Sequence, residues 1–261
     1  MVHSLRAAVA EARRHGDLYF AALVPQDRIE KAFGTARWSW QGWIYTPAVT
    51  VWVFLSQCLS SDHSCRDAVA RLLAWRITRG LKPCSAETSA YCTARNDLPE
   101  EVVHELMRDT GKQVEDESPH TWLWHGREVC VVDGSTITMP DTAANQAAYP
   151  QMKAQKPGCG FPIARILVIF SLSVGTVLEA AVGKYKGKQT GENSLFRRLY
   201  DALDEGDIIL ADRYFSGWSD VALPLGRGID IVVRKHQGRA TDFRTGKRLG
   251  KNDHLVFWTR P

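Results

Sequence analysis

The chain has 261 residues, 44% of them hydrophobic, which is enough to bury a sizeable core in one or two domains. The formal net charge is only +4, so a polyanion partner is indicated only where the basic residues are concentrated. The longest apolar run, residues 48–55, is too short to span a membrane, and the first residues do not form a secretion signal. These features favour a soluble protein with no membrane partner.

The six cysteines form no Cys-x-x-Cys pair and are scattered over helix-like and strand-like segments. This usage is typical of reduced thiols rather than of a disulfide framework or a zinc site. We therefore expect a cytoplasmic location.

Residues 1–118 predict helices only. An Ala-rich helix over 4–15 and a second over 17–33 each end near a glycine that can take a left-handed cap. Pro47 can occupy the first turn of an apolar helix to about Leu59, and Ser64 begins a capping-box-like helix that stops at Gly80. Ser85 can cap a short helix to about residue 96, and Asp97 can cap one to about Gln113.

The helix after Ser64, a short turn and the polar helix after Ser85 resemble a helix-turn-helix DNA reader. Any small helical bundle gives the same pattern, and these residues alone favour bundle packing. The acidic segment 115–119, which ends in a proline, suggests a boundary. We expect a helical domain over 1–118 and a second domain after it.

After this boundary the pattern changes to strands. A β-branched run over 128–136 carries Asp133 to its end, and apolar segments over 164–172 and 177–182 form a hairpin around Gly175. A helix after Thr190 or Asn193, a strand ending in Asp212, a helix over 217–225 and a strand over 229–233 follow. The order strand, strand, strand, helix, strand, helix, strand predicts a mixed α/β sheet with helices on its faces.

Asp133 and Asp212 each lie where an apolar strand ends. If the two strands are parallel neighbours, their carboxylates converge at the edge of the sheet where open α/β folds place their chemistry. A single aspartate at a strand end is more often a cap on the following turn. Two such residues on strands in this order favour a site for a divalent cation.

Neighbouring residues discriminate among the possible chemistries. A phosphatase of the haloacid dehalogenase type needs a second aspartate two positions after the first, but Ser135 is there. The hairpin fits a receiver-like domain poorly, and the Gly-x-Ser-x-Gly elbow of serine hydrolases is missing from the sequence. The remaining candidate is a two-metal site acting on a phosphodiester, which needs three or four carboxylates.

Basic residues are concentrated at the C-terminal end of the sequence. Eight Lys or Arg stand against two Asp between residues 234 and 260, and the block includes Arg234, Lys235, Arg244, Lys247 and Arg248. Such a block suits a nucleic-acid backbone, although a solvated charged face explains it equally well.

Three segments resemble DDE transposases of bacterial insertion sequences, in the insertion-sequence-four branch. They are Val132-Asp133-Gly134-Ser135-Thr136-Ile137-Thr138-Met139-Pro140-Asp141-Thr142, Gly160-Phe161-Pro162-Ile163-Ala164-Arg165 and Leu210-Ala211-Asp212-Arg213-Tyr214-Phe215. The likeness runs from about residue 126 to the end, with a weaker likeness over 54–99.

The resemblance implies an RNase H-like catalytic domain with Mg²⁺ or Mn²⁺ as cofactor. It also implies cleavage and strand transfer at terminal inverted repeats, with target DNA as the second substrate and a homodimer on DNA in the full-length family. Asp133 then corresponds to the first acid of the catalytic triad and Asp212 to the second, with Arg213 and Tyr214 supporting the site. The block after Arg234 resembles the start of the family's β-rich insertion. The resemblance thus implies a DNA-binding domain over 1–118, a catalytic core over 119–234 and the start of the insertion over 235–261.

The third acid of the family is a Glu in a Tyr-x2-Arg-x3-Glu-x6-Lys motif beyond that insertion, and this sequence has no Glu after Glu205. We therefore expect an N-terminal portion of a transposase, catalytically inactive by itself. The alternatives are a non-catalytic DNA-binding fragment that restrains transposition and an RNase H-like nuclease without preference for the repeats.

Overall fold

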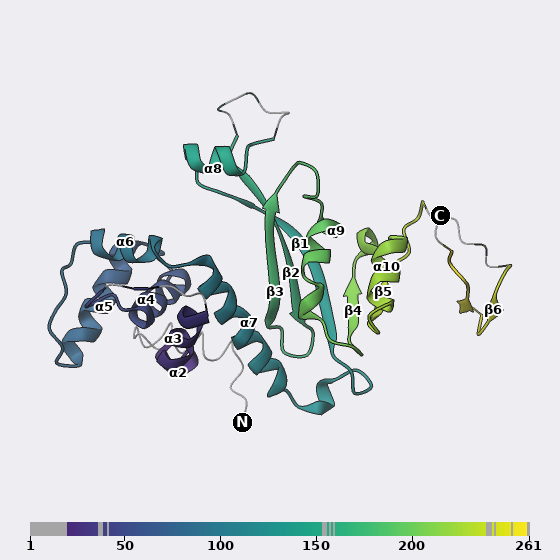
Figure 1. The fold of residues 1–261 in the computed structure, drawn as a ribbon, viewed down its shortest axis with the longest axis horizontal. Coiled ribbons are helices and arrows are strands. Elements are labelled where there is room, and N and C mark those ends of the chain that lie inside the picture. The colour runs from purple at the N-terminus through teal and green to yellow at the C-terminus, as the bar shows by residue number, and fades with distance from the viewer. Residues whose placement is uncertain are drawn as a thin grey trace. The chain divides into compact units, whose positions relative to one another are not determined.

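The computed structural model describes residues 20–35, 39–40, 42–152, 156, 158, 160–238, 242, 244–251 and 253–259. The chain divides into two compact units, residues 1–110 and 111–261 (Figure 1). The division falls inside a helix rather than in the acidic segment 115–119. Over these described residues, every helix is too short or too polar to cross a membrane.

Unit 1 is helical, as the sequence predicts. Its elements are α2 (Phe20–Leu23), α3 (Gln26–Thr35), α4 (Pro47–Leu59), α5 (Cys65–Thr78), α6 (Ser89–Asn96) and the first part of α7 (Glu100–Asp116). The predicted cap at Ser64 is confirmed, because its hydroxyl accepts the backbone N–H of Asp67. Pro47 lies in the first turn of α4 as predicted, and the hydroxyl of Thr46 caps that helix by accepting the N–H of Val49. The apolar α4 is the central helix of the bundle, with α2, α3, α5 and α6 packed against it.

Three helix predictions for this half of the chain need correction, and a fourth, over 4–15, lies outside the described residues. The expected helix over 17–33 is interrupted at Pro25, whose ring disfavours helical geometry at the preceding residue. Ser85 does not cap α6, because its hydroxyl accepts the N–H of Glu87 in a local turn and the helix begins at Ser89. Finally, α7 continues to Asp116, past the expected end at Gln113.

Unit 2 contains a five-stranded mixed sheet. Its strands are β1 (Val129–Thr138), β2 (Ile163–Ser171), β3 (Val177–Lys184), β4 (Ile208–Ala211) and β5 (Asp230–Val233), in the spatial order β3-β2-β1-β4-β5. The first three are antiparallel neighbours, and β4 and β5 join in parallel. This is the strand order of RNase H-like domains, so the predicted fold class is confirmed.

One face of the sheet forms the core of unit 2. Cys130 and Val132 of β1 lie on this face together with Ile209 and Ala211 of β4, and they pack against α9 (Glu192–Arg198). The helix α10 (Trp218–Leu225) packs beside β5, as Figure 1 shows. Because side chains alternate along a strand, the residues between these core positions project from the opposite face.

Two further elements lie outside the sheet. The segment over 140–162, expected to be irregular, contains a short helix, α8 (Ala143–Ala148), capped by the hydroxyl of Thr142. In the basic block, β6 (Lys247–Arg248) pairs with β7 (His254–Leu255) in a small antiparallel ribbon. This ribbon agrees with the strand-like character predicted there.

The end of α7 is fixed closely to the edge of the sheet. A Cβ atom on Gly111 would collide with the carbonyl oxygen of Val177 at the start of β3. One turn later, Glu115 is only 7% exposed and accepts a hydrogen bond from Lys112 at 3.2 Å. Burial raises the pKa of the Glu115 carboxyl, and the nearby Glu128 and Asp207 carboxylates raise it further, against the opposing effect of Lys112.

We predict that Gly111→Ala destabilises unit 2 by about 1–3 kcal/mol, although alanine is the better helix former, because the methyl group displaces α7 from β3. The matched control is Gly34→Ala in α3, where a Cβ meets nothing within 4 Å. That change should stabilise unit 1 by up to about 1 kcal/mol. Urea unfolding of both variants checks the prediction, and equal effects would contradict the close packing.

The buried carboxyl of Glu115 generates a pH-dependent prediction. A carboxyl whose pKa is raised on folding contributes most to stability below its ordinary pKa, and that contribution is lost as the pH rises through the raised value. Glu115→Gln should therefore increase the unfolding free energy at pH 7–8 relative to the parent and flatten its decline above the ordinary carboxyl pKa of 4.5. Thermal unfolding across pH 4–8 measures this, with Glu117→Gln, an exposed carboxyl two residues further along the chain, as the control.

Candidate functional site

The two candidate acids are neighbours at one edge of the sheet. In the parallel pairing of β1 with β4, Val131 is opposite Leu210 and Val132 is opposite Ala211. Asp133 follows Val132 and Asp212 follows Ala211, and the backbone of Asp212 is still extended. Adjacent strands are roughly 4.8 Å apart, and in-register parallel residues project to the same side. The register therefore brings the two exposed carboxylates together at the carboxyl end of β4, beside the middle of β1. The predicted strand end at Asp133 is wrong, because β1 continues to Thr138 in its pairing with β2.

Each carboxylate is oriented by a backbone N–H group of a residue that follows it closely in the chain. Oδ1 of Asp133 accepts the N–H of Gly134 at 2.9 Å, and Oδ1 of Asp212 accepts the N–H of Tyr214 at 2.8 Å. The second bond also makes Asp212 the cap of the 3₁₀ turn over Arg213–Phe215. Asp212 therefore has the common structural role of a strand-end aspartate, which is to cap the following turn. Capping engages one of its two carboxylate oxygens and is compatible with cation binding by the other.

The predicted supporting residues lie at the same edge or close to it. Arg213 and Tyr214 follow Asp212 directly and are exposed, and the side chain of Phe215 is buried in the core. Since Ala211 pairs with Val233 in the β4–β5 ladder, Arg234 leaves β5 beside Asp212, followed by Lys235. Cationic groups thus accompany the carboxylates at the carboxyl ends of β4 and β5.

The remaining basic candidates lie away from the sheet, on the ribbon of β6 and β7. Lys247 and Arg248 form β6, and both are exposed. Arg244 is 90% exposed, and its guanidinium binds both carboxylate oxygens of Asp242, at 2.8 and 3.0 Å. The structure does not bring these three residues to the paired acids. Arg239 and Arg260 of the same block lie outside the described residues.

The sequence reasoning missed one carboxylate near this edge. Glu192, the first residue of α9, lies against Gly134, where a Cβ atom would be 2.8 Å from its Cγ and Cδ atoms. Arg165 of β2 pairs with Glu192 at 3.6 Å and stacks over the ring of Tyr185. The signal available in the sequence was the acidic residue directly after Gly191, at the start of the helix that covers the sheet.

Glu192 and Asp133 reach this edge from opposite faces. Gly134 has the same parity along β1 as Val132 and Cys130, which face α9, whereas Asp133 has the other parity. Across the described parts of the chain, no three His, Cys, Asp or Glu side chains are arranged to hold a metal ion. The residues present therefore fit a cation only as a pair of carboxylates, Asp133 and Asp212.

The strand order places unit 2 among RNase H-like domains. In comparisons with known proteins, the chain matches no protein-family model. It is a homologue of the transposase InsG of insertion sequence element IS4 from Escherichia coli (strain K12), with 27% identity over 209 residues. The aligned region is 79% of this chain and 45% of that protein, so the chain spans about half the length of this relative.

A solved structure gives a more distant similarity. It is a piggyBac transposase synaptic complex with hairpin DNA, with a TM-score of 0.38 and 10% sequence identity, over 88% of this chain and 53% of that one. The resemblance to insertion-sequence transposases seen in the motifs is confirmed by the InsG homology.

The adjacency of two like charges generates a prediction. Asp133→Asn should stabilise the protein by a few tenths of a kcal/mol without divalent cations, because it removes repulsion from the facing Asp212. Millimolar Mg²⁺ or Mn²⁺ should raise the Tm of the parent, and less so that of the variant. The control is Glu205→Gln, an exposed carboxyl before the start of β4, which should leave the response to the cation unchanged. A variant whose Tm responds like the parent would count against the pair as a cation site.

Proposed function

We propose that this chain is part of a transposase that acts on DNA at the ends of an insertion sequence, with Asp133 and Asp212 as two of its catalytic carboxylates. The observation that supports the proposal is the β1–β4 register, in which the residues directly after the last pair, Val132 and Ala211, are the two aspartates, at the carboxyl end of β4 in an RNase H-like sheet. The homology to the InsG transposase supports the same function.

Phosphodiester chemistry at this edge requires charge compensation. When bound, Mg²⁺ or Mn²⁺ would stabilise the entering and leaving oxygens of a phosphoryl displacement. In the proposal, Asp133 and Asp212 hold the cation with the carboxylate oxygens that the N–H groups of Gly134 and Tyr214 leave available. Arg234, at the end of β5, adds positive charge for the DNA backbone next to the acids.

The DNA is proposed to contact both units. Arg213 and Tyr214 lie beside Asp212 and are exposed to a bound strand, and the exposed pair Lys247 and Arg248 suits further phosphate contacts. The substrates are the terminal inverted repeats and a target duplex, bound by a pair of copies. Unit 1 is proposed to contribute repeat recognition through its helices, and the proposal includes action in the cytoplasm.

A second function is favoured by the number of acids. The described residues bring two carboxylates together, whereas two-metal phosphoryl transfer needs three or four. We therefore propose that this chain by itself binds terminal-repeat DNA without efficient cleavage. In a mixture with longer copies, such a chain restrains transposition by occupying the repeats.

Repeat binding is tested with duplexes that carry the inverted repeats of the element encoding the chain. We expect binding that weakens steeply with salt and is at least tenfold tighter than binding to a scrambled duplex of equal length. The double substitution Lys247→Ala and Arg248→Ala should weaken binding to both duplexes equally. It should also reduce the slope of log affinity against log salt concentration by about two. Equal affinity for the repeat and scrambled duplexes would contradict the transposase assignment.

Cleavage is tested separately on the same repeat duplex with Mn²⁺. We expect little nicking by the chain alone, and none that exceeds the level of Asp133→Ala. Robust nicking by the parent that disappears in both Asp133→Ala and Asp212→Ala would overturn the proposed inactivity while supporting the two acids as catalytic residues. Nicking that survives both substitutions would remove Asp133 and Asp212 from the mechanism.

A further inference from the structure

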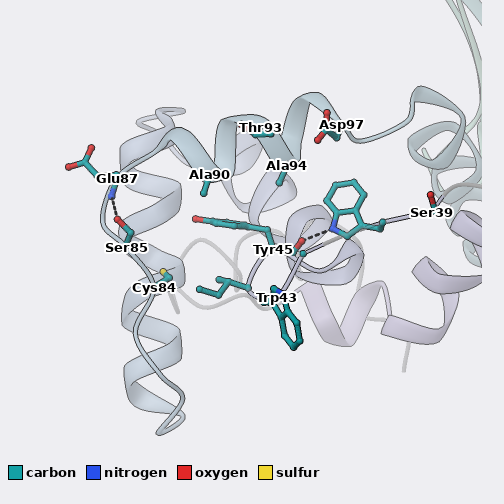
Figure 2. A pocket seen from close by; sticks show the side chains of 13 residues that line it. Ser39, Trp43, Tyr45, Cys84, Ser85, Glu87, Ala90, Thr93, Ala94 and Asp97 are labelled. Carbon is teal, nitrogen blue, oxygen red and sulfur yellow. Dashed lines mark hydrogen bonds between the residues drawn. The ribbon is translucent and has the colours of Figure 1, made fainter.

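Unit 1 contains a cavity that the proposed DNA chemistry does not use. It has a volume of about 660 Å³ and lies between the loop 39–45, the segment 84–87 and α6 (Figure 2). The loop contributes Trp40, Trp43 and Tyr45, and α6 contributes the small side chains Ala90 and Ala94. A cavity of this size accommodates one or two side chains of a bound segment.

The aromatic wall of the cavity is held in a defined shape. The indole N–H of Trp40 donates to the carbonyl oxygen of Tyr45 at 2.7 Å, and the ring of Trp40 packs edge-on against Phe33. Gly42 is enclosed by the same contact, because a Cβ atom there would lie 2.6 Å from the Tyr45 carbonyl oxygen. Trp43, by contrast, is fully exposed beside this fixed loop, so its ring is available to a ligand.

Tyr45 supplies a buried polar group without a partner. The residue is only 8% exposed, and its hydroxyl makes no hydrogen bond within the described part of the chain. In Figure 2 the hydroxyl is directed toward the end of the cavity that Ser85 and Glu87 line. Burial raises the pKa of Tyr45 to about 12, so the hydroxyl stays neutral and can donate or accept. A buried hydroxyl without a partner costs free energy that a bound polar group would recover.

The charge of the lining is negative. Glu87 and Asp97 are the ionisable carboxyl groups at the cavity, and none of the described lining residues is Lys, Arg or His. Arg76 acts electrostatically on Tyr45, but its Nε donates to the carbonyl oxygen of Lys82 and it does not line the cavity. Aromatic faces combined with carboxylates attract a cation and repel a phosphate.

We propose that this cavity binds the arginine side chain of a protein segment. The guanidinium would donate to the Tyr45 hydroxyl and pair with Glu87, which lines the same end of the cavity (Figure 2). The exposed indole of Trp43 and the Asp97 carboxylate lie at other places around the cavity (Figure 2) and would contact the rest of the bound segment. The small side chains Ala90 and Ala94 leave room for the backbone of the bound segment along α6. The inference stands apart from the proposed function, because it assigns unit 1 a protein contact in addition to any DNA contact.

The chemistry also discriminates against an unstacked nucleobase. A base would find an aromatic face here, but it arrives with a phosphate on each side, next to two carboxylates and with no cation among the described lining residues. An arginine places the opposite charge at the same position. The charge of the lining therefore decides between these two occupants.

The test uses the whole chain, labelled with ¹⁵N, and follows its tryptophan indole resonances. The probe is the capped tripeptide acetyl-Ala-Arg-Ala-amide, and the control probe replaces arginine with citrulline, which keeps the shape and removes the charge. We expect saturable binding of the arginine peptide and at least tenfold weaker binding of the citrulline peptide. Free arginine should bind more weakly than the capped peptide, because it lacks a flanking backbone to lie along α6.

Two substitutions locate the binding in the cavity. Tyr45→Phe removes only the hydroxyl, so it should leave the Tm unchanged or raise it. Binding of the arginine peptide should become about fivefold weaker, which is the effect of losing one neutral hydrogen bond. Glu87→Gln with Asp97→Asn should reduce the preference for arginine over citrulline to within about twofold. Glu101→Gln, an exposed carboxyl on α7, is the matched control and should change neither value.

Several results would overturn the inference. Equal binding of the arginine and citrulline peptides would remove the charge preference, and unchanged binding by Tyr45→Phe would remove the hydroxyl from the site. Free arginine that binds as tightly as the capped peptide would reject a protein segment as the ligand. A short single-stranded oligonucleotide that displaces the peptide from these resonances would assign the cavity to a nucleobase instead.

Discussion

The parallel pairing of β1 with β4 is the constraint on which the candidate site depends. These strands are far apart in the sequence, and only their register decides whether Asp133 and Asp212 are adjacent. A slip of one residue would turn one of the carboxylates to the core face, where α9 packs. The register is fixed by burial, because Val132 and Ala211 on one face and the acids on the other leave no alternative pairing with the same hydrophobic core.

The same pairing explains why charged groups gather at one edge of unit 2. β4 and β5 end together beside the middle of β1, so the residues that follow them meet Asp133 whatever their separation along the chain. The antiparallel hairpin of β2 and β3 widens the sheet on the other side and supplies the surface that α9 covers. The fold thus separates a packed face, which provides stability, from an open edge, where chemistry is possible.

Much of this arrangement could be predicted from the sequence. Apolar runs ending in Asp133 and Asp212 gave the strands, and the order of elements gave the sheet, because β-branched runs and capped amphipathic helices are local signals. The helix predictions were wrong at Pro25, which interrupts a helix, at Ser85, which does not cap one, and at the end of α7, which extends to Asp116. At these places neighbouring residues compete for the same backbone groups. Glu192 was missed because its place against Gly134 depends on how α9 lies over the sheet, which no local pattern encodes.

In the described part of the chain, the five-stranded sheet ends at β5, a strand of four residues whose one neighbouring strand is β4. Val232 is 53% exposed there, so a row of main-chain donors and acceptors faces outward beside an apolar side chain. An edge strand of this kind can pair with a strand of another molecule, and proteins commonly oppose such pairing with lysine or arginine at the edge. Arg234 and Lys235, directly after β5, place positive charge beside this edge, where it disfavours pairing with a second copy of the strand.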